Sequence, residues 1–176
     1  MKDDLVKHKV GKAVRECEIH LDRMGYAMRA MDHFMPLDKA AYARLSMEQV
    51  QVVDQFVFRF SKVQDAMGER LFKAALELVG EEVKSRTFLD ILNRLEQLGA
   101  LESREQWMGL RVMRNRFAHE YDDDAVSMSE ALNTAYAEAP RLMEIYGQIR
   151  GFVANYLDLS PIPSDQQPKT SNQKPK

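Results

Sequence analysis

The chain has 176 residues, of which 30% are charged and 45% hydrophobic, and its formal net charge is -2 at pH 7. A charge so close to zero excludes a surface that binds nucleic acid everywhere, although it leaves room for a local basic site. Cys17 is the only cysteine, so the chain can form neither an internal disulfide nor a zinc site built on cysteines.

The N-terminal segment is charged and lacks the apolar core of a signal peptide, and no window approaches 18 uncharged apolar residues. We therefore expect a cytoplasmic protein that has no membrane partner. Helix-breaking residues are scarce, because only Pro36 and Pro140 precede the last sixteen residues. Together with abundant Ala, Leu, Glu and Gln, this composition favours a single all-α domain.

Apolar residues spaced three and four apart predict two long helices in the first half of the chain. The first covers about residues 3–34. The second runs from Ser46, which opens a Ser-x-x-Gln capping box, to about Val79, and Gly80 is expected to stop it. The residues between the two helices form a connector.

Three further helices are predicted in the second half. One covers about residues 87–98, and another begins at Ser103 with a second capping-box pattern and ends near His119. A third pattern of this kind, Ser127-x-x-Glu130, is expected to open the last helix, which extends to about Leu159.

Two features of the C-terminal third complete the predicted architecture. Pro140 is expected to kink the last helix. Residues 160–176 are polar and rich in proline, so they are predicted to form a disordered tail. The sequence thus predicts an all-α, up-and-down bundle of about five helices over residues 1–159.

The segment RNRFAHEY, Arg114 to Tyr121, precedes three aspartates and combines groups that could form a site. At about 100° per residue, Arg114 and Tyr121 fall in the apolar sector of their helix, whereas His119 projects about 140° away from Arg114. An arginine on an apolar face needs a partner or an open cleft. Arg114 and His119 can therefore act on one group only if the helix frays, or if a second copy faces the first across a two-fold axis.

These side chains suit the cleavage of RNA. A histidine with a pKa near 6.5 can take or give a proton at neutral pH, and an arginine binds phosphate oxygens bidentately. RNA supplies its own nucleophile, the 2′-hydroxyl, so this chemistry requires no metal and no cofactor. Arg104, Arg111 and Arg116 lie on the same predicted helix and could extend a track for phosphates.

A purely structural interpretation also fits. The helix dipole favours cations at a helix C-terminus, which explains Arg114, Arg116 and His119 without any function. The aspartates that follow could cap the next helix, or they could hold a divalent ion together with His119. The other histidines, His8, His20 and His33, have no spacing typical of metal ligands.

The eight residues from Arg114 to Tyr121 resemble the R-x-x-x-x-H-x-Y signature of HEPN domains, and specifically of the HepT-like branch of bacterial toxin–antitoxin systems. The asparagine after the arginine also matches, and the motif lies near the end of the fourth predicted helix, as in the family. The resemblance implies a metal-independent endoribonuclease toxin that works as a homodimer. It makes Arg114 and His119 the catalytic pair and Asn115 a supporting residue, to which the helix position adds Arg111 and Arg116 as candidate RNA-binding residues.

The same resemblance implies a regulator. In HepT-like toxins, a cognate nucleotidyltransferase antitoxin AMPylates the tyrosine that corresponds to Tyr121. An adenylate at Tyr121 would carry negative charge on the Arg114 face of the helix and would block entry of a phosphate. HEPN domains also bring a polar residue from an earlier helix, and the candidates here are Asp54, Arg59, Asp65 and Glu69.

Two alternatives stay open at this point. Some HEPN proteins have lost catalysis, so the chain could instead be an inactive HEPN protein that binds a nucleotidyltransferase or a nucleotide as a regulatory scaffold. It could also be a plain helical dimerisation module in which Arg114 makes only structural ion pairs. Toxicity of the chain expressed alone separates the first alternative from a ribonuclease, and the stability of an Arg114 variant tests the second.

Overall fold

The computed structural model describes residues 2–119 and 125–157, and the side chains of residues 3–117 and 126–157. All regular secondary structure in these ranges is helical, which confirms the predicted all-α class. The elements are α1 (Lys2–Met31), α2 (Lys39–Ala43), α3 (Met47–Ala66), the π-helical turn η1 (Met67–Leu71), α4 (Phe72–Leu78), α5 (Phe88–Gln97), α6 (Arg104–His119) and α7 (Ala125–Ala154). Within these ranges, no helix has both the length and the apolar character needed to cross a bilayer.

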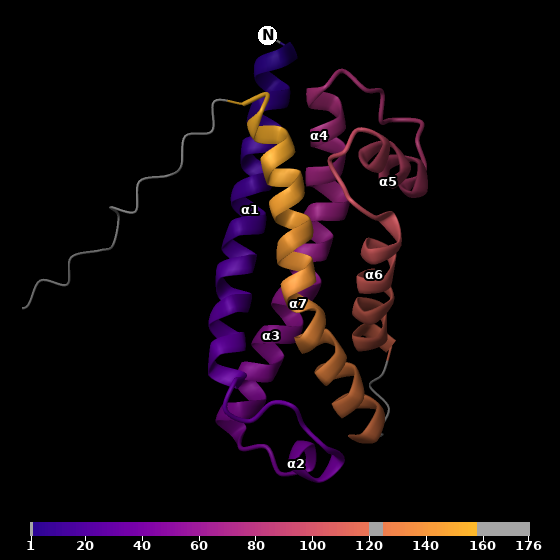
Figure 1. Cartoon of the computed structure of the whole chain (residues 1–176). Helices are drawn as coiled ribbons and strands as arrows, with labels where there is room; N and C mark the ends of the chain where they lie inside the picture. The colour runs from indigo at the N-terminus through magenta and orange to yellow at the C-terminus, as the bar shows by residue number, and fades with distance from the viewer. Residues whose placement is uncertain (1, 120–124, 158–176) are drawn as a thin grey trace, which may run out of the picture.

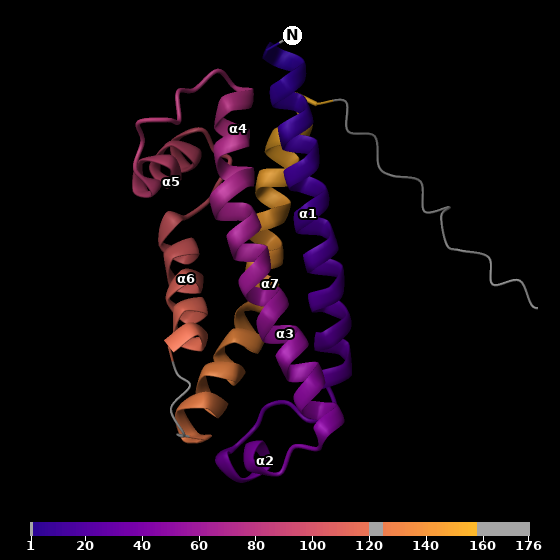
Figure 2. The same ribbon diagram turned by 180° about the vertical axis from the view of Figure 1, so that it is seen from behind.

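The long helices run side by side in a bundle (Figures 1 and 2). A central rod is formed by α3, η1 and α4, which follow one another without a break. The rod is flanked by α1 on one side and by α5 and α6 on the other, while α7 packs across it. The short helix α2 closes the end of the bundle that lies away from the N-terminus (Figure 1).

The core is continuous through the bundle and is built from large apolar side chains of every long helix. Phe56, Phe60 and Phe72 of the central rod are fully buried, and so is Cys17 of α1. Burial raises the pKa of the Cys17 thiol to about 12, so this cysteine behaves as a small apolar core residue. Methionines at helical spacing fill the gaps between these side chains, and Met24, Met31 and Met67 are fully buried.

The predicted start of α3 is confirmed. The Ser46 hydroxyl accepts the Gln49 amide N–H at 3.2 Å, and Gln49 Oε1 accepts the Ser46 amide N–H at 2.9 Å, which completes the capping box. The prediction for Ser127 is wrong, because α7 already begins at Ala125. A Ser-x-x-Glu pattern lies inside a helix here and does not start one.

Two glycines end helices in the first part of the chain. Gly80 and Gly99 have φ angles of +82° and +70°, a backbone conformation that residues with a Cβ rarely adopt. Each lies two residues after the end of its helix, which is Leu78 for α4 and Gln97 for α5. The stop predicted at Gly80 is therefore present.

The predicted second helix is interrupted. In the π-helical turn η1, the Phe72 amide donates to the carbonyl of Met67, five residues earlier. The chain continues into α4 without a loop, so the turn inserts one extra residue into an otherwise continuous rod.

The last helix contains Pro140, which has no amide hydrogen to donate to the carbonyl four residues earlier. Pro140 stands at the middle of α7, and Figure 1 shows this helix bending near its middle, as the sequence predicts. The described part of α7 ends at Ala154, before the expected Leu159. The tail predicted at residues 160–176 lies outside the described residues.

The predicted connector after α1 contains the short helix α2, and α7 holds the chain just before it. Asn133 of α7 accepts the Leu37 amide N–H at 2.8 Å and donates to the Leu37 carbonyl at 2.7 Å. Both backbone groups of a buried loop residue are thus paired by one side chain. The connector is fixed to the bundle through this contact.

We expect Asn133→Ala to lower the free energy of unfolding by about 1–3 kcal/mol, because two hydrogen bonds of roughly 0.5–1.5 kcal/mol each are lost. Urea unfolding measures this loss. Thr134→Ala is the matched control, since Thr134 is exposed on the same helix and bonds only the Glu130 carbonyl among the described residues. Equal losses in the two variants would contradict the role given to Asn133.

Candidate functional site

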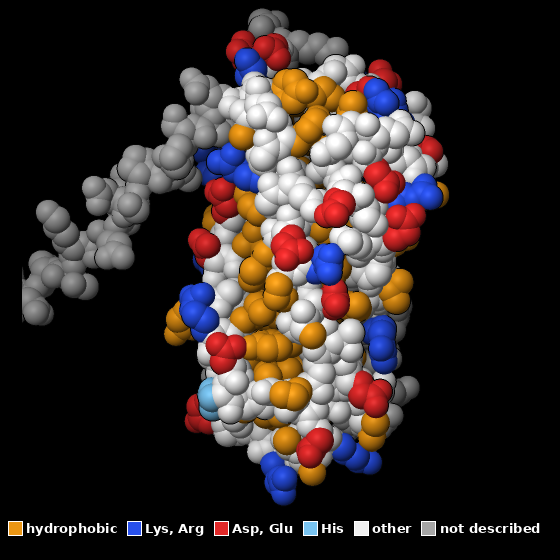
Figure 3. Space-filling view, viewed as in Figure 1, with side chains coloured by type: hydrophobic (Ala, Val, Ile, Leu, Met, Phe, Trp, Pro, Cys, Tyr) orange, Lys and Arg blue, Asp and Glu red, His pale blue; other side chains and the backbone are white. Residues whose placement is uncertain are grey.

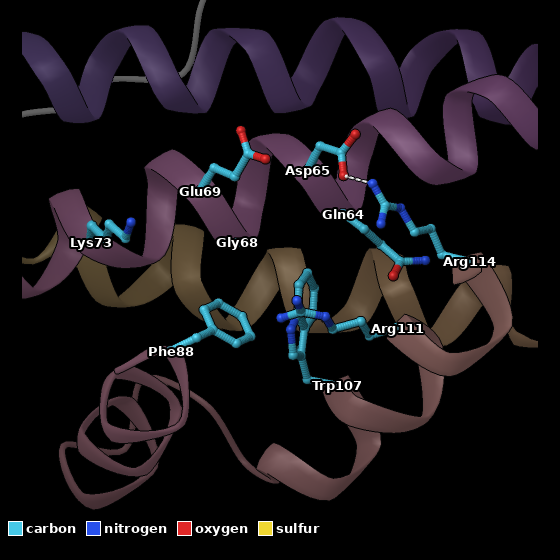
Figure 4. Close-up of a pocket in the computed structure, with 9 residues that line it drawn as sticks. All are labelled: Gln64, Asp65, Gly68, Glu69, Lys73, Phe88, Trp107, Arg111 and Arg114. Atoms are coloured by element: carbon cyan, nitrogen blue, oxygen red, sulfur yellow. Dashed lines mark hydrogen bonds and ion pairs between the residues drawn. The ribbon is translucent and has the colours of Figure 1, made fainter. Parts of the chain in front are cut away.

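A cleft of about 200 Å³ lies between the central rod and the helices α5 and α6 (Figure 4). Residues of α3, η1, α4, α5 and α6 surround it. The cleft is lined by Gln64, Asp65, Gly68, Glu69, Lys73, Phe88, Trp107, Arg111 and Arg114. Two of the residues that the sequence predicts for the site, Arg111 and Arg114, are therefore part of it.

Arg114 has the partner that its place on the apolar face requires. Its Nη2 donates to Asp65 Oδ1 at 2.7 Å, and its Nη1 donates to Asn115 Oδ1 at 3.1 Å. The Arg114 side chain is 33% exposed and the Asp65 side chain 23% exposed, so the ion pair sits at the rim of the cleft and remains in contact with solvent. The guanidinium is thus held in place from both α3 and α6.

The structure distinguishes among the four polar residues considered on the earlier helix. Asp65 pairs with Arg114, and Glu69 lines the same cleft one turn further along. Asp54 is exposed and does not line the cleft. Asp65 is therefore the earlier-helix residue that completes the Arg114 arrangement.

Arg59 points to a different place. Its Nη1 lies 2.9 Å from Nδ1 of His20 on α1. Burial and the neighbouring Arg59 charge lower the pKa of His20, so the neutral imidazole accepts the hydrogen bond from the guanidinium. Arg59 and His20 join α1 to α3 and take no part in the cleft.

The remaining predicted site residues are not gathered around the cleft. Asn115 and Arg116 are exposed, and of the two only Asn115 is bonded to Arg114. Arg104, at the start of α6, pairs with Glu105 at 2.9 Å and with Asn93 of α5. The predicted phosphate track is therefore reduced to Arg111 and Arg114.

His119 is the last residue of α6, and its side chain lies outside the described part of the chain, as does Tyr121. The acidic residues 122–124, considered above as a possible ion site, also lie outside it. Within residues 3–117 and 126–157, no three His, Cys, Asp or Glu side chains come together as a group that could hold a metal ion.

The charges on the cleft are unevenly distributed. Lys73, Arg111 and Arg114 are basic, and Asp65 and Glu69 are acidic. The basic groups thus outnumber the acidic ones here, whereas acidic and basic side chains are interspersed on the face of the molecule shown in Figure 3. Lys73 is a basic residue that the sequence reasoning missed, because α4 is not part of the motif.

Two aromatic rings form the floor and one wall of the cleft. Trp107 packs against Phe72 with ring centroids 4.6 Å apart, and the Arg111 guanidinium lies 4.7 Å from the centroid of the Phe88 ring. Both rings lie close to Gly68 of the π-helical turn, since a Cβ built there would be 3.5 Å from atoms of Phe88 and of Trp107, an ordinary van der Waals contact. Trp107 lies four residues before Arg111 on α6, and no motif in the sequence marks it as part of the site.

The deepest part of the cleft holds polar atoms that have no partner among the described residues. Gln64 is 4% exposed, and neither its Nε2 nor its Oε1 is hydrogen-bonded; the same is true of Nε1 of Trp107, which is 2% exposed. The position of Gln64 in the sequence indicates that it is buried. Gln64 follows Phe60 by four residues, so it lies on the same apolar stripe of the helix and places an amide there. Buried polar groups without partners are rare in folded proteins.

Removing the Gln64 amide should therefore stabilise the protein. We expect Gln64→Met, which keeps the length of the side chain, to raise the free energy of unfolding by about 1–3 kcal/mol, the typical cost of a buried polar group left unpaired. Urea unfolding of the full chain gives the comparison, with Gln51→Met on the exposed side of α3 as the control. A destabilised Gln64→Met variant would show that the amide has a structural role.

Comparison with known proteins assigns the chain to no family. No family model matches it, and no similar curated protein or solved structure was found. The resemblance to HEPN domains rests on the motif from Arg114 to Tyr121, and function is inferred from the residues of the cleft and of that motif.

Proposed function

We propose that the chain is a metal-independent endoribonuclease of the HEPN type, a HepT-like toxin that cleaves RNA as a homodimer. The observation that carries this proposal is the position of Arg114. It is fixed by Asp65 and Asn115 at the rim of a cleft, on the helix that ends at His119. Cleavage of a phosphodiester requires a preoriented positive charge for the phosphate and a residue that can transfer a proton.

The contacts of Arg114 are compatible with binding a phosphate. A guanidinium has five N–H donors, and the bonds to Asp65 and Asn115 use two of them. The others can bind phosphate oxygens without loss of the contacts that orient the side chain. Of the other charged residues on the cleft, Lys73 and Arg111 are basic and Glu69 is acidic, so one positive charge is in excess beyond the Asp65–Arg114 pair.

The reaction needs one proton to leave and one to arrive. The 2′-hydroxyl oxygen attacks the adjacent phosphorus, the bond from phosphorus to the 5′-oxygen breaks, and the products are a 2′,3′-cyclic phosphate and a free 5′-hydroxyl. His119 performs one of these transfers, taking the proton from the attacking hydroxyl or giving one to the leaving oxygen, and water performs the other. Arg114 stabilises the charge that develops on the phosphate oxygens.

A second copy of the chain fits the arrangement of α6. Met108 and Val112, which lie four residues apart on α6, are 39% and 60% exposed and form an apolar stripe. Position 119 falls about 20° from Val112 around the helix axis, at about 100° per residue. Pairing of this stripe across a two-fold axis would bring His119 of one subunit close to α6 of the other, whereas Arg114, about 160° from Val112 around the helix axis, faces Asp65 of its own central rod.

Loss of either catalytic residue should remove activity. We expect Arg114→Ala and His119→Ala each to slow RNA cleavage by roughly 10²–10⁴-fold, the range found for removal of a charge-stabilising or proton-transferring group. Both variants should also relieve the growth inhibition caused by expressing the chain alone. Cleavage is measured on single-stranded and transfer RNA, with and without EDTA, and full activity is expected in EDTA.

Exposed residues of α1 provide matched controls, because α1 lies on the other side of the central rod from α6 (Figure 2). Arg15→Ala and His8→Ala should cleave RNA like the unaltered chain.

Mixing Arg114→Ala with His119→Ala should restore part of the activity, since a mixed dimer contains one intact pair. An active His119→Ala, or loss of cleavage on chelation, would rule out the mechanism; an unaltered chain without toxicity would instead favour the regulatory scaffold.

Tyr121 is the proposed point of control by a cognate nucleotidyltransferase antitoxin. An adenylate on this tyrosine would add an anion and a bulky group to the motif that contains Arg114, and this anion would compete with the RNA phosphate for the guanidinium. We expect Tyr121→Phe to keep ribonuclease activity but to escape silencing when the antitoxin is expressed with it. Intact mass measurement after co-expression checks the modification, and Tyr42→Phe serves as the control. A Tyr121→Phe variant that is still silenced would contradict this assignment.

A further inference from the structure

The inner wall of the cleft contains three polar atoms with unmet hydrogen-bonding capacity. They are Nε2 and Oε1 of Gln64 and Nε1 of Trp107, and both side chains are more than nine-tenths buried. Gln64 offers a donor and an acceptor next to each other, and the indole offers one further donor. Such a set matches the edge of a planar ring that carries an acceptor beside a donor.

The size and walls of the cleft limit what can bind there. At about 200 Å³, it is smaller than the roughly 300–1,000 Å³ of pockets for drug-sized ligands, so it takes a group of about one ring system. Phe88 and Trp107 provide flat apolar surfaces, and Arg111 reaches from α6 across Trp107 toward Phe88 (Figure 4). Aromatic rings and guanidinium planes are the surfaces on which unpaired bases stack.

The position of Gln64 relative to Arg114 supplies the third constraint. Gln64 is the neighbour of Asp65 in sequence, and Figure 4 shows its amide directly beside the pair formed by Asp65 and Arg114. A group held by Gln64 would therefore be adjacent to an anion held by Arg114. A nucleotide has this layout, with a ring and a phosphate joined through one sugar.

We propose that the cleft is a subsite for a single nucleobase of the RNA strand, with Gln64 and Trp107 binding the base edge and Phe88 and Arg111 contacting its face. The inference rests on the proposed ribonuclease function, because it assigns the base next to the phosphate at Arg114. It adds a determinant of sequence preference that lies outside the R-x-x-x-x-H-x-Y motif. The known motif residues contact phosphate and move protons, whereas Gln64 discriminates between bases.

Trp107 is the only tryptophan in the chain, so its fluorescence reports directly on occupancy of the cleft. The full-length protein is titrated with the four nucleoside 5′-monophosphates, with ribose 5-phosphate, and with hexanucleotides of each base. The hexanucleotides carry 2′-O-methyl groups, which remove the nucleophile and prevent cleavage. We expect saturable changes in fluorescence with at least one base, none with ribose 5-phosphate, and tighter binding of the matching hexanucleotide because it also reaches Arg114 and Lys73.

Variants test the role of Gln64. Gln64→Met should weaken binding of the preferred base by roughly tenfold and should reduce the difference between bases, while Gln51→Met should change neither. The expected increase in stability of Gln64→Met excludes unfolding as a cause of weaker binding. Equal affinities in the two variants, or binding of ribose 5-phosphate as tight as that of the nucleotides, would overturn the subsite.

The two proposals fail in different ways. Cleavage of RNA without base-dependent binding at Trp107 would overturn the nucleobase subsite and leave the ribonuclease proposal standing. Base-dependent binding of the hexanucleotides without cleavage would overturn catalysis and retain the subsite. Binding of free mononucleotides but not of the hexanucleotides would overturn the assignment to an RNA strand.

Discussion

The central rod of α3, η1 and α4 has helices packed around most of its circumference, and this constraint determines much of the molecule. The faces of the rod that meet these helices must be apolar, and the buried residues Phe56, Phe60, Ala66 and Leu71 follow that rule, while Lys62 and Glu69 are exposed. Gln64 breaks the rule on a buried face. Departures of this kind from a consistent local pattern are expected at functional sites, and the Gln64 amide lies on the wall of the cleft.

Much of the architecture is readable in the sequence, because amphipathic periodicity is a local property. The capping box at Ser46 and the position of Gly80 mark the helix that they bound, and Pro140 acts through a missing donor in its own helix. The start assigned to Ser127 was wrong for a related reason. A hydroxyl residue followed three positions later by a carboxylate also occurs within helices, and only the preceding residues decide which case applies.

The candidate site was predictable only in part. The position of Arg114 on an apolar face predicts that it needs a partner or a cleft, and helical geometry alone yields that statement. The identity of Asp65 as the partner depends on the placement of α6 against α3, which no spacing within either helix determines. The same holds for Phe88, which enters the cleft from α5, far from the motif in sequence.

The π-helical turn has a consequence for which residues share the cleft. In an uninterrupted α-helix, Asp65 and Lys73 would point about 80° apart, and Gln64 and Lys73 about 180° apart. The extra residue in η1 removes about 100° of rotation, so the first pair becomes nearly aligned and the second differs by about 80°. Winding the same residues as a regular α-helix would form all the backbone bonds, but it would divide the wall of the cleft between two faces. The π-helical turn, rather than any single side chain, therefore places the Asp65 carboxylate and the Lys73 amine on the same surface.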